Sequence, residues 1–260
     1  MFQKLRGVTL NAAILIFVLS SVSSHAFGQE CAKKEQSRDL KVVEDSFKKD
    51  FPLTQIREVR ATDIEGLFEI TARGNVFYYH LKSSQLFFGD LMTKDFNNVT
   101  AERRKEVAAS WEKIIAARLK DLPLAKAIKI GSGKHVVIEF SDIDCPFCRN
   151  VEHIFKKYTD MTRYVFLFPL ESIHPAAVKK ATSVLCSKNR ATAYADAMDG
   201  KLDSGDIKLC NDNKVAALLK EYKDIARTLE VDGTPAIWID GRVIRGADVK
   251  KIESILTAGK

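Results

Sequence analysis

The chain has 260 residues, 46% of them hydrophobic, and a formal net charge of +7. This length is enough for one large domain or two small ones. Lysine and arginine are interspersed with aspartate and glutamate along the sequence, which argues against a nucleic-acid-binding protein.

Residues 1–26 are predicted to form a cleavable secretory signal peptide. A positive start with Lys4 and Arg6 precedes an apolar stretch that is too short for an ordinary membrane-spanning helix, and residues 24–26 fit the small-x-small cleavage pattern. Cleavage there would leave residues 27–260, with the formal charge lowered from +7 to +5. No second long apolar run follows. We therefore expect a soluble, exported protein in a compartment where disulfides form.

Residues 27–98 are predicted to form a small N-terminal domain. We expect a helix at about residues 38–49, followed between residues 54 and 92 by β-branched and aromatic stretches with turn signals at 73–75 and 82–84. This pattern predicts a small antiparallel meander. A domain of this size is marginal alone because small domains bury a smaller fraction of their surface. Pairing with a second copy would relieve that marginality.

Residues 99–127 are predicted to form a linker helix between two globular domains. Apolar residues recur at helical spacing and share one face, with charges on the other: Val107, Trp111, Ile114 and Ile115. Pro123 then marks the end of the helix.

Residues 128–260 are predicted to form a second domain in which strands and helices alternate. A continuous apolar run predicts that the first strand, residues 135–141, is buried on both faces. A helix follows from residue 146. The later segments are a strand at 164–170, a helical stretch at 175–229, a strand within 233–241 and a terminal helix at 248–256. This order is typical of a thioredoxin-like fold with a helical insertion.

Cys145 and Cys148 lie three positions apart in the stretch DIDCPFC, where the buried strand gives way to the helix. The chain has no second CxxC or HxxxH pair to complete four zinc ligands, and a structural disulfide here would close only a tiny loop. At a helix N-terminus, unpaired N–H groups and the helix dipole favour a thiolate. We therefore predict a reactive dithiol without metal or other cofactor, with Cys145 the exposed nucleophile and Cys148 the more buried resolving thiol.

Two motifs resemble the thioredoxin superfamily: EFSDIDCPFC and GTPAIW. The mature chain resembles the DsbC/DsbG family of periplasmic disulfide isomerases. The stretch GLFEITARGNVFYYHLKSSQLFFGDL is similar to the N-terminal dimerisation domain of that family, and residues 128–260 are similar to its catalytic domain. The resemblance implies that Cys145 attacks, that Cys148 resolves, and that Thr234 and Pro235 are the threonine and cis-proline facing the disulfide. From the sequence alone, Pro235 also fits an ordinary proline at the start of a strand.

The other cysteines also take their interpretation from the resemblance. It implies a structural disulfide between Cys186 and Cys210 in the helical insertion, closing a loop of about 25 residues and worth on the order of 3 kcal/mol. Cys31 is left over near the mature N-terminus. We favour a free thiol there over a bridge between two subunits.

Glu139 departs from the family pattern. It stands six residues before Cys145, where thioredoxins and DsbA oxidases carry a buried acid and DsbC-type proteins commonly have an apolar residue. Such an acid, with its pKa raised by desolvation, can accept the proton of the resolving thiol. Our hypothesis is that Glu139 serves Cys148 in this way. The alternative is a strand carboxylate that reaches solvent or pairs with a lysine.

The fold class expected is therefore α+β and α/β, with three candidate functions. The first is a periplasmic, homodimeric thiol:disulfide interchange enzyme that isomerises or reduces non-native disulfides in misfolded clients, kept reduced by a DsbD-type membrane reductase. The second is a DsbA-like dithiol oxidase, which Glu139 and Pro146 favour. The third is a holdase chaperone with a redox-regulated cleft. The N-terminal domain favours the first over the second, since single-domain oxidases lack it.

Overall fold

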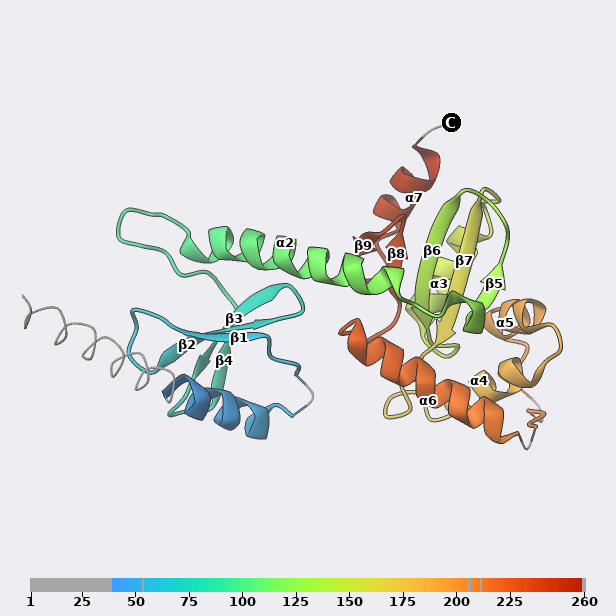
Figure 1. Cartoon of the computed structure of the whole chain (residues 1–260), viewed down its shortest axis with the longest axis horizontal. Coiled ribbons are helices and arrows are strands. Elements are labelled where there is room, and N and C mark those ends of the chain that lie inside the picture. Colours follow the sequence, from blue (N-terminus) through green and yellow to red (C-terminus); the bar gives the residue numbers. More distant parts are fainter. Residues whose placement is uncertain (1–38, 53, 205–206, 211, 259–260) are drawn as a thin grey trace, which may run out of the picture. The chain divides into compact units, whose positions relative to one another are not determined.

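The computed structural model (Figure 1) describes residues 39–52, 54–204, 207–210 and 212–258. The predicted signal peptide and Cys31 lie outside these residues. The chain divides into two compact units, and the division falls between Arg104 and Lys105, inside helix α2 (Val99–Lys120). Within the described part of the chain, every helix is too short or too polar to cross a bilayer.

Unit 1 contains a helix over residues 39–50 and a four-stranded antiparallel sheet in the order β1-β2-β3-β4. The strands are β1 (Glu58–Ala61), β2 (Leu67–Ala72), β3 (Asn75–His80) and β4 (Gln85–Phe87). Arg73 and Gly74 join β2 to β3, and both have positive φ, as a two-residue hairpin turn requires. The predicted antiparallel meander is confirmed.

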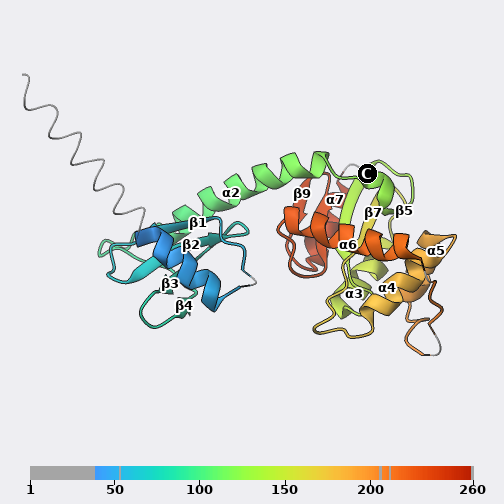
Figure 2. The same ribbon diagram turned by 60° about the horizontal axis from the view of Figure 1, so that its bottom comes forward.

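The core of unit 1 lies between this helix and the sheet, which are adjacent in both views (Figures 1 and 2). The Phe47 ring meets the Tyr79 ring edge-on at 5.3 Å between centroids. The Tyr79 hydroxyl donates to Asp50 at 2.7 Å and also contacts Ser46. A buried aromatic thus keeps its polar end hydrogen-bonded.

Helix α2 has its first turn in unit 1 and the rest in unit 2. At its start, Asn98 Oδ1 accepts from the Ala101 N–H at 2.8 Å, which caps the helix. Farther along, Trp111 Nε1 donates to Glu230 at 2.9 Å. The helix therefore makes its own contacts within each unit.

Unit 2 contains a mixed five-stranded sheet in the order β5-β7-β6-β8-β9. β6 runs parallel to β7, and the other neighbouring pairs are antiparallel. The strands are β5 (Ile128–Ile130), β6 (His135–Ser141), β7 (Met161–Leu167), β8 (Ala236–Ile239) and β9 (Arg242–Ile244). The predicted combination of an antiparallel meander and a thioredoxin-like domain is confirmed as the fold class.

Helices cover both faces of this sheet. After a short 3-10 turn (Leu124–Lys126), they are α3 (Pro146–Phe155), α4 (Ala177–Cys186), α5 (Arg190–Met198), α6 (Asn213–Thr228) and α7 (Val249–Thr257). Val137 belongs to a buried cluster with Val151 and Phe155 of α3, whereas Phe140 belongs to a second cluster with Trp111. Residues of opposite parity in a strand point to opposite faces. The predicted burial of β6 on both faces is therefore confirmed.

Two boundaries differ from the sequence prediction. β7 begins at Met161 and ends at Leu167, three residues before each predicted limit, and Pro169 has no N–H with which to extend the ladder. The stretch predicted as helical from 175 to 229 is interrupted after α5. Gly200, with φ +83°, stands just past the helix end in the left-handed conformation that terminates many helices.

Candidate active site

The dithiol lies at the start of α3. Cys145 is the N-cap residue with extended backbone, Pro146 occupies the first turn, and Cys148 follows inside the helix. Before it, Asp142 closes a turn, accepting from the Asp144 N–H at 2.8 Å through its side chain and from the Cys145 N–H at 3.2 Å through its carbonyl. The predicted helix start is confirmed, with proline where no hydrogen bond is lost.

Cys145 is more enclosed than expected, whereas Cys148 is buried as predicted. Cys148 has no exposed surface, and only 4% of Cys145 is exposed. The predicted order of burial holds, but the prediction of an exposed Cys145 is wrong. The Thr234 carbonyl, which precedes the cis bond to Pro235, lies 3.4 Å from Cys145 Sγ and helps to cover it.

The two thiols titrate in opposite directions. The hydrogen bond from the Cys148 thiol, helped by the N–H groups of residues 147 and 148, lowers the pKa of Cys145 to about 5 although burial opposes this. Burial, followed by the hydrogen bond to Cys145, raises the pKa of Cys148. At neutral pH Cys145 is therefore a thiolate and Cys148 a thiol. Cys145 is then suited to act as the nucleophile and Cys148 as the resolving thiol.

Glu139 is completely buried, and its charge contributes to the raised pKa of Cys148. Its carboxylate accepts from Arg163 Nη2 at 2.9 Å and from the Tyr194 hydroxyl at 3.3 Å. Burial raises the pKa of Glu139, and Arg163 opposes that rise. The carboxylate thus neither reaches solvent nor pairs with a lysine, which removes both alternatives considered from the sequence.

Arg163, Glu152 and Tyr194 were missed in the sequence analysis. The same Arg163 Nη2 also donates to Glu152 at 2.6 Å, so one buried guanidinium serves two buried carboxylates. Glu152 lies one helical turn after Cys148 on α3. For Arg163 the signal available in the sequence was one charged residue inside a mostly apolar strand, but its pairing with Glu139 and Glu152 is tertiary.

Asp142 connects the dithiol to the loop after β7. Its buried carboxylate accepts from the Leu170 N–H at 2.7 Å and contacts His174 Nδ1 at 2.9 Å. Its own N–H points to Cys148 Sγ at 3.5 Å. The Asp142 side chain therefore holds the loop after β7, while the Asp142 N–H faces the sulfur of Cys148.

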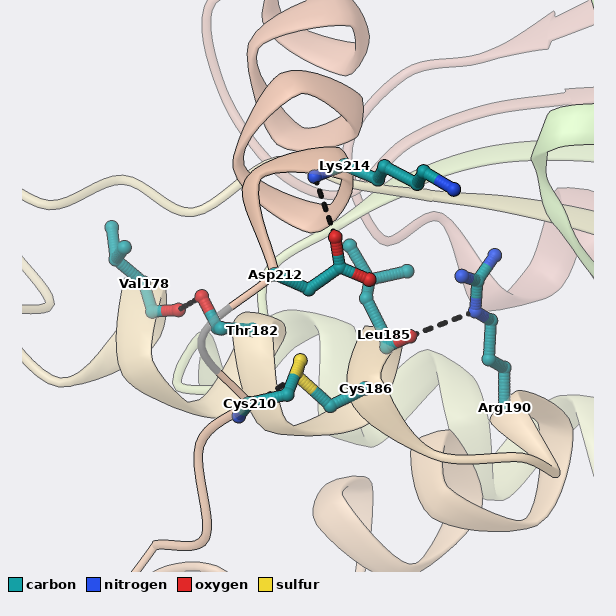
Figure 3. Close-up of a disulfide and its surroundings, with 8 residues drawn as sticks. All are labelled: Val178, Thr182, Leu185, Cys186, Arg190, Cys210, Asp212 and Lys214. Atoms are coloured by element: carbon teal, nitrogen blue, oxygen red, sulfur yellow. Dashed lines mark hydrogen bonds between the residues drawn. A yellow bond between two sulfur atoms is a disulfide. The ribbon is translucent and has the colours of Figure 1, made fainter.

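A disulfide joins Cys186, the last residue of α4, to Cys210, with 5.7 Å between their Cα atoms (Figure 3). The Asp212 side chain, also drawn there, accepts from the Lys214 N–H at 2.8 Å and caps α6. The disulfide therefore ties the end of α4 to the segment leading into α6. Among the described residues, no three His, Cys, Asp or Glu side chains gather in a way that would hold a metal ion.

Known proteins resemble both units. The family model "Disulfide bond isomerase protein N-terminal domain" matches residues 28–101, and the model "Thioredoxin-like domain" matches residues 122–257. The "Probable thiol:disulfide interchange protein DsbC" of Bordetella avium is 31% identical over 205 residues, covering 76% of this chain and 68% of that protein. DsbC of Salmonella typhimurium is 25% identical over 197 residues, covering 74% and 76%. The crystal structure of a disulfide interchange protein from Neisseria gonorrhoeae matches 52% of this chain and 96% of its own, with 35% identity and a TM-score of 0.41.

The titration of Cys145 is open to a direct test. Alkylation of the fully reduced protein by iodoacetamide should rise to half its maximal rate near pH 5, since the thiolate is the reacting species and the pKa of Cys145 is lowered to about 5. Mass spectrometry should place the label on Cys145, and Cys145→Ser should abolish the fast reaction. Half-maximal alkylation near the ordinary thiol value of about 8.5 would contradict the assignment.

Proposed function

The chain belongs to the DsbC/DsbG family within the thioredoxin superfamily and is a thiol:disulfide oxidoreductase, and we propose that it isomerises or reduces non-native disulfides in exported client proteins. The observation that carries the proposal is that the two thiols differ in pKa and in burial. Cys145 has a lowered pKa at the start of α3, while Cys148 is fully buried with a raised pKa directly behind it.

The exchange proceeds through a mixed disulfide. The Cys145 thiolate attacks one sulfur of a client disulfide, forming a new S–S bond and releasing the other client sulfur as a thiolate. In isomerisation, that thiolate attacks a different client disulfide, and a later client thiolate displaces Cys145. In reduction, Cys148 attacks the Cys145 sulfur instead. The client then leaves with two thiols, and the enzyme keeps the disulfide.

We assign to Glu139 the role of accepting the Cys148 proton in the reductive branch. Cys148 must lose that proton before it attacks, and its raised pKa opposes the loss. The negative charge of Glu139 adds to this opposition. Moving the proton from Cys148 to Glu139 removes the repulsion at the moment when the thiolate forms. Arg163 holds the Glu139 carboxylate in place for the transfer.

Unit 1 supplies the proposed contact with a second copy. β4 is an edge strand, and large apolar side chains on it and the following loop are exposed: Phe87, Phe88, Met92 and Phe96. An exposed apolar edge strand is a template for pairing with another chain. We place the homodimer interface at this edge.

The cellular setting follows from the same proposal. With its predicted signal peptide removed, the enzyme would act in the periplasm, where new client disulfides form. A reductase that isomerises disulfides must be kept reduced against that environment. We therefore propose a DsbD-type membrane reductase as the electron donor.

A DsbA-like oxidase is the second candidate, and one observation favours it. A strongly lowered nucleophile pKa stabilises the reduced protein and makes its disulfide more oxidising. Such a protein would donate the Cys145–Cys148 disulfide to reduced clients rather than repair wrong ones.

Refolding of a scrambled multi-disulfide protein in a glutathione buffer separates these functions. The mature chain should restore native client, and Cys145→Ser should remove essentially all of this gain, because no mixed disulfide can then form. Fast oxidation of a reduced client without repair of a scrambled one would replace the proposal by the oxidase function. Suppression of client aggregation that survives Cys145→Ser would report a separate holding activity.

Glu139→Gln should slow resolution of a mixed disulfide between Cys145 and a model peptide by about tenfold or more, because a proton acceptor contributes at least that much. Isomerisation that does not use Cys148 should be spared. Glu152→Gln is the matched control, since it removes the other carboxylate from Arg163 and leaves Glu139 in place. Equal slowing in the two variants would assign the effect to the buried charge balance and not to proton transfer.

Light scattering at micromolar concentration should give the mature chain twice its monomer mass. Phe88→Asp, a change at a side chain that is 77% exposed, should shift the mass to that of one chain, because a charge then lies in the proposed interface. Val42→Asp on the helix of unit 1 introduces the same charge at another exposed site and should leave the mass unchanged. A monomeric mass for the unmodified chain would contradict the proposed homodimer.

A further inference from the structure

Four charged side chains form a closed cluster beside the dithiol, here called the charge quartet: Asp144, Arg149, Lys180 and Asp203. Asp144 immediately precedes Cys145, and Arg149 immediately follows Cys148. Arg149 binds Asp203 with two hydrogen bonds, of 2.6 Å and 2.7 Å. Two acids and two bases bring the formal charge of the quartet to zero.

Lys180 links the acids of the quartet to each other. It is a lysine of α4 with only 6% of its surface exposed, and it donates to Asp203 at 2.6 Å and also to Asp144. A nearly buried ammonium persists only when it is paired. Arg149 is fixed in turn by an Nε–H bond of 2.8 Å to the Ile143 carbonyl. The quartet is therefore a defined arrangement at the edge of the CxxC turn.

Asp203 reaches the quartet from the segment between α5 and α6. Its N–H donates to the Gly200 carbonyl at 2.9 Å, which closes a turn. A Cβ at Gly200 would lie 3.0 Å from Asp203 Oδ2, at a residue whose φ is already +83°. Glycine thus gives the carboxylate room to meet Arg149. In the sequence, Asp203 lies between Cys186 and Cys210, so the disulfide drawn in Figure 3 closes the stretch of chain that contains it.

We propose that Asp203 is a positioning residue for thiol exchange: delivered by the disulfide-closed loop, its carboxylate balances Arg149 and Lys180 beside Cys145 and limits how far these two bases stabilise the Cys145 thiolate. This rests on the proposed function, in which Cys145 is the nucleophile. Loss of one acid from the quartet leaves an excess positive charge next to Cys145, and loss of one base leaves an excess negative charge. The first stabilises the thiolate and the second destabilises it.

The other charged groups around the dithiol are the same in all the variants compared. They are Asp142 with His174 in the flanking loops, and the buried set Glu139, Glu152 and Arg163. None of them contacts Asp203 or Lys180 among the hydrogen bonds and ion pairs described for those two residues. Substitutions at Asp203 and Lys180 therefore change the quartet and leave these other groups in place.

The test is the absorbance of reduced protein at about 240 nm, where thiolates absorb, as a function of pH. Asp203→Asn should lower the pKa of Cys145 by about half a unit, and Lys180→Met should raise it by a similar amount. Arg149→Met repeats the second arm should Lys180→Met not fold. If these side chains only shaped the loop, replacing Asp203 and replacing Lys180 would shift the pKa of Cys145 in the same direction.

Asp199→Asn is the matched control. It removes the same charge from the same segment, but Asp199 pairs with Lys156 at the far end of α3, and the pKa of Cys145 should not move. Shifts of equal sign in the Asp203 and Lys180 variants, or no shift in either, would overturn the proposal. Because the titration needs no client, that result is distinct from failure of the proposed function, which appears as lack of client repair.

A double-mutant cycle tests whether the Cys186–Cys210 disulfide positions Asp203. Joint replacement of Cys186 and Cys210 by alanine should shift the pKa of Cys145 in the same direction as Asp203→Asn, since the loop no longer delivers the carboxylate. Adding Asp203→Asn to that variant should then have a smaller effect than in the unmodified chain. A fully additive shift would show that the loop places Asp203 without the disulfide, and would overturn that half of the proposal.

Discussion

The chemistry of this protein depends on one constraint, which is that the first turn of a helix has N–H groups without backbone partners. Cys145 is placed at that turn as the N-cap of α3, and the Cys148 thiol donates to it from inside the helix. β6 and its turn at Asp142 deliver the helix start, and the segment before β8 covers the sulfur with the Thr234 carbonyl.

The buried charges behind the dithiol follow a related logic. Two carboxylates, Glu139 and Glu152, share one guanidinium, so full ionisation leaves one unbalanced negative charge in a region of low dielectric constant. Such a set takes up a proton readily, and burial raises the pKa of Glu139 accordingly. Glu152 thus adds to the rise in the pKa of Glu139 that burial causes, and this rise is what the proposed proton-acceptor role of Glu139 uses.

The sequence predicted those features that depend on local pattern. The CxxC pair, the buried β6 strand and the antiparallel meander all follow from spacing and alternation within short segments. Spacing alone did not predict the cover over Cys145, because the Thr234 carbonyl comes from a segment 89 positions later, and only the family resemblance placed Thr234 and Pro235 opposite the dithiol. Arg163 was missed for the same reason, since its two partners lie on different elements. The loop after α5 was read as helix because one glycine carries little weight in an alanine-rich stretch.

Unit 2 contains two cysteine pairs. They differ because Cys145 stands at the start of a helix and Cys186 at the end of one. Cys145 stands at the start of α3, where the helix dipole favours a thiolate and makes it a good leaving group. Cys186 is the last residue of α4, where the dipole has the opposite sign and disfavours a thiolate. Attack by a thiolate on the Cys210 sulfur would have to release Cys186 as an unstabilised anion. Exchange by this route is therefore disfavoured, which supports a structural part for the Cys186–Cys210 bond and leaves redox cycling as the proposed part of the Cys145–Cys148 dithiol.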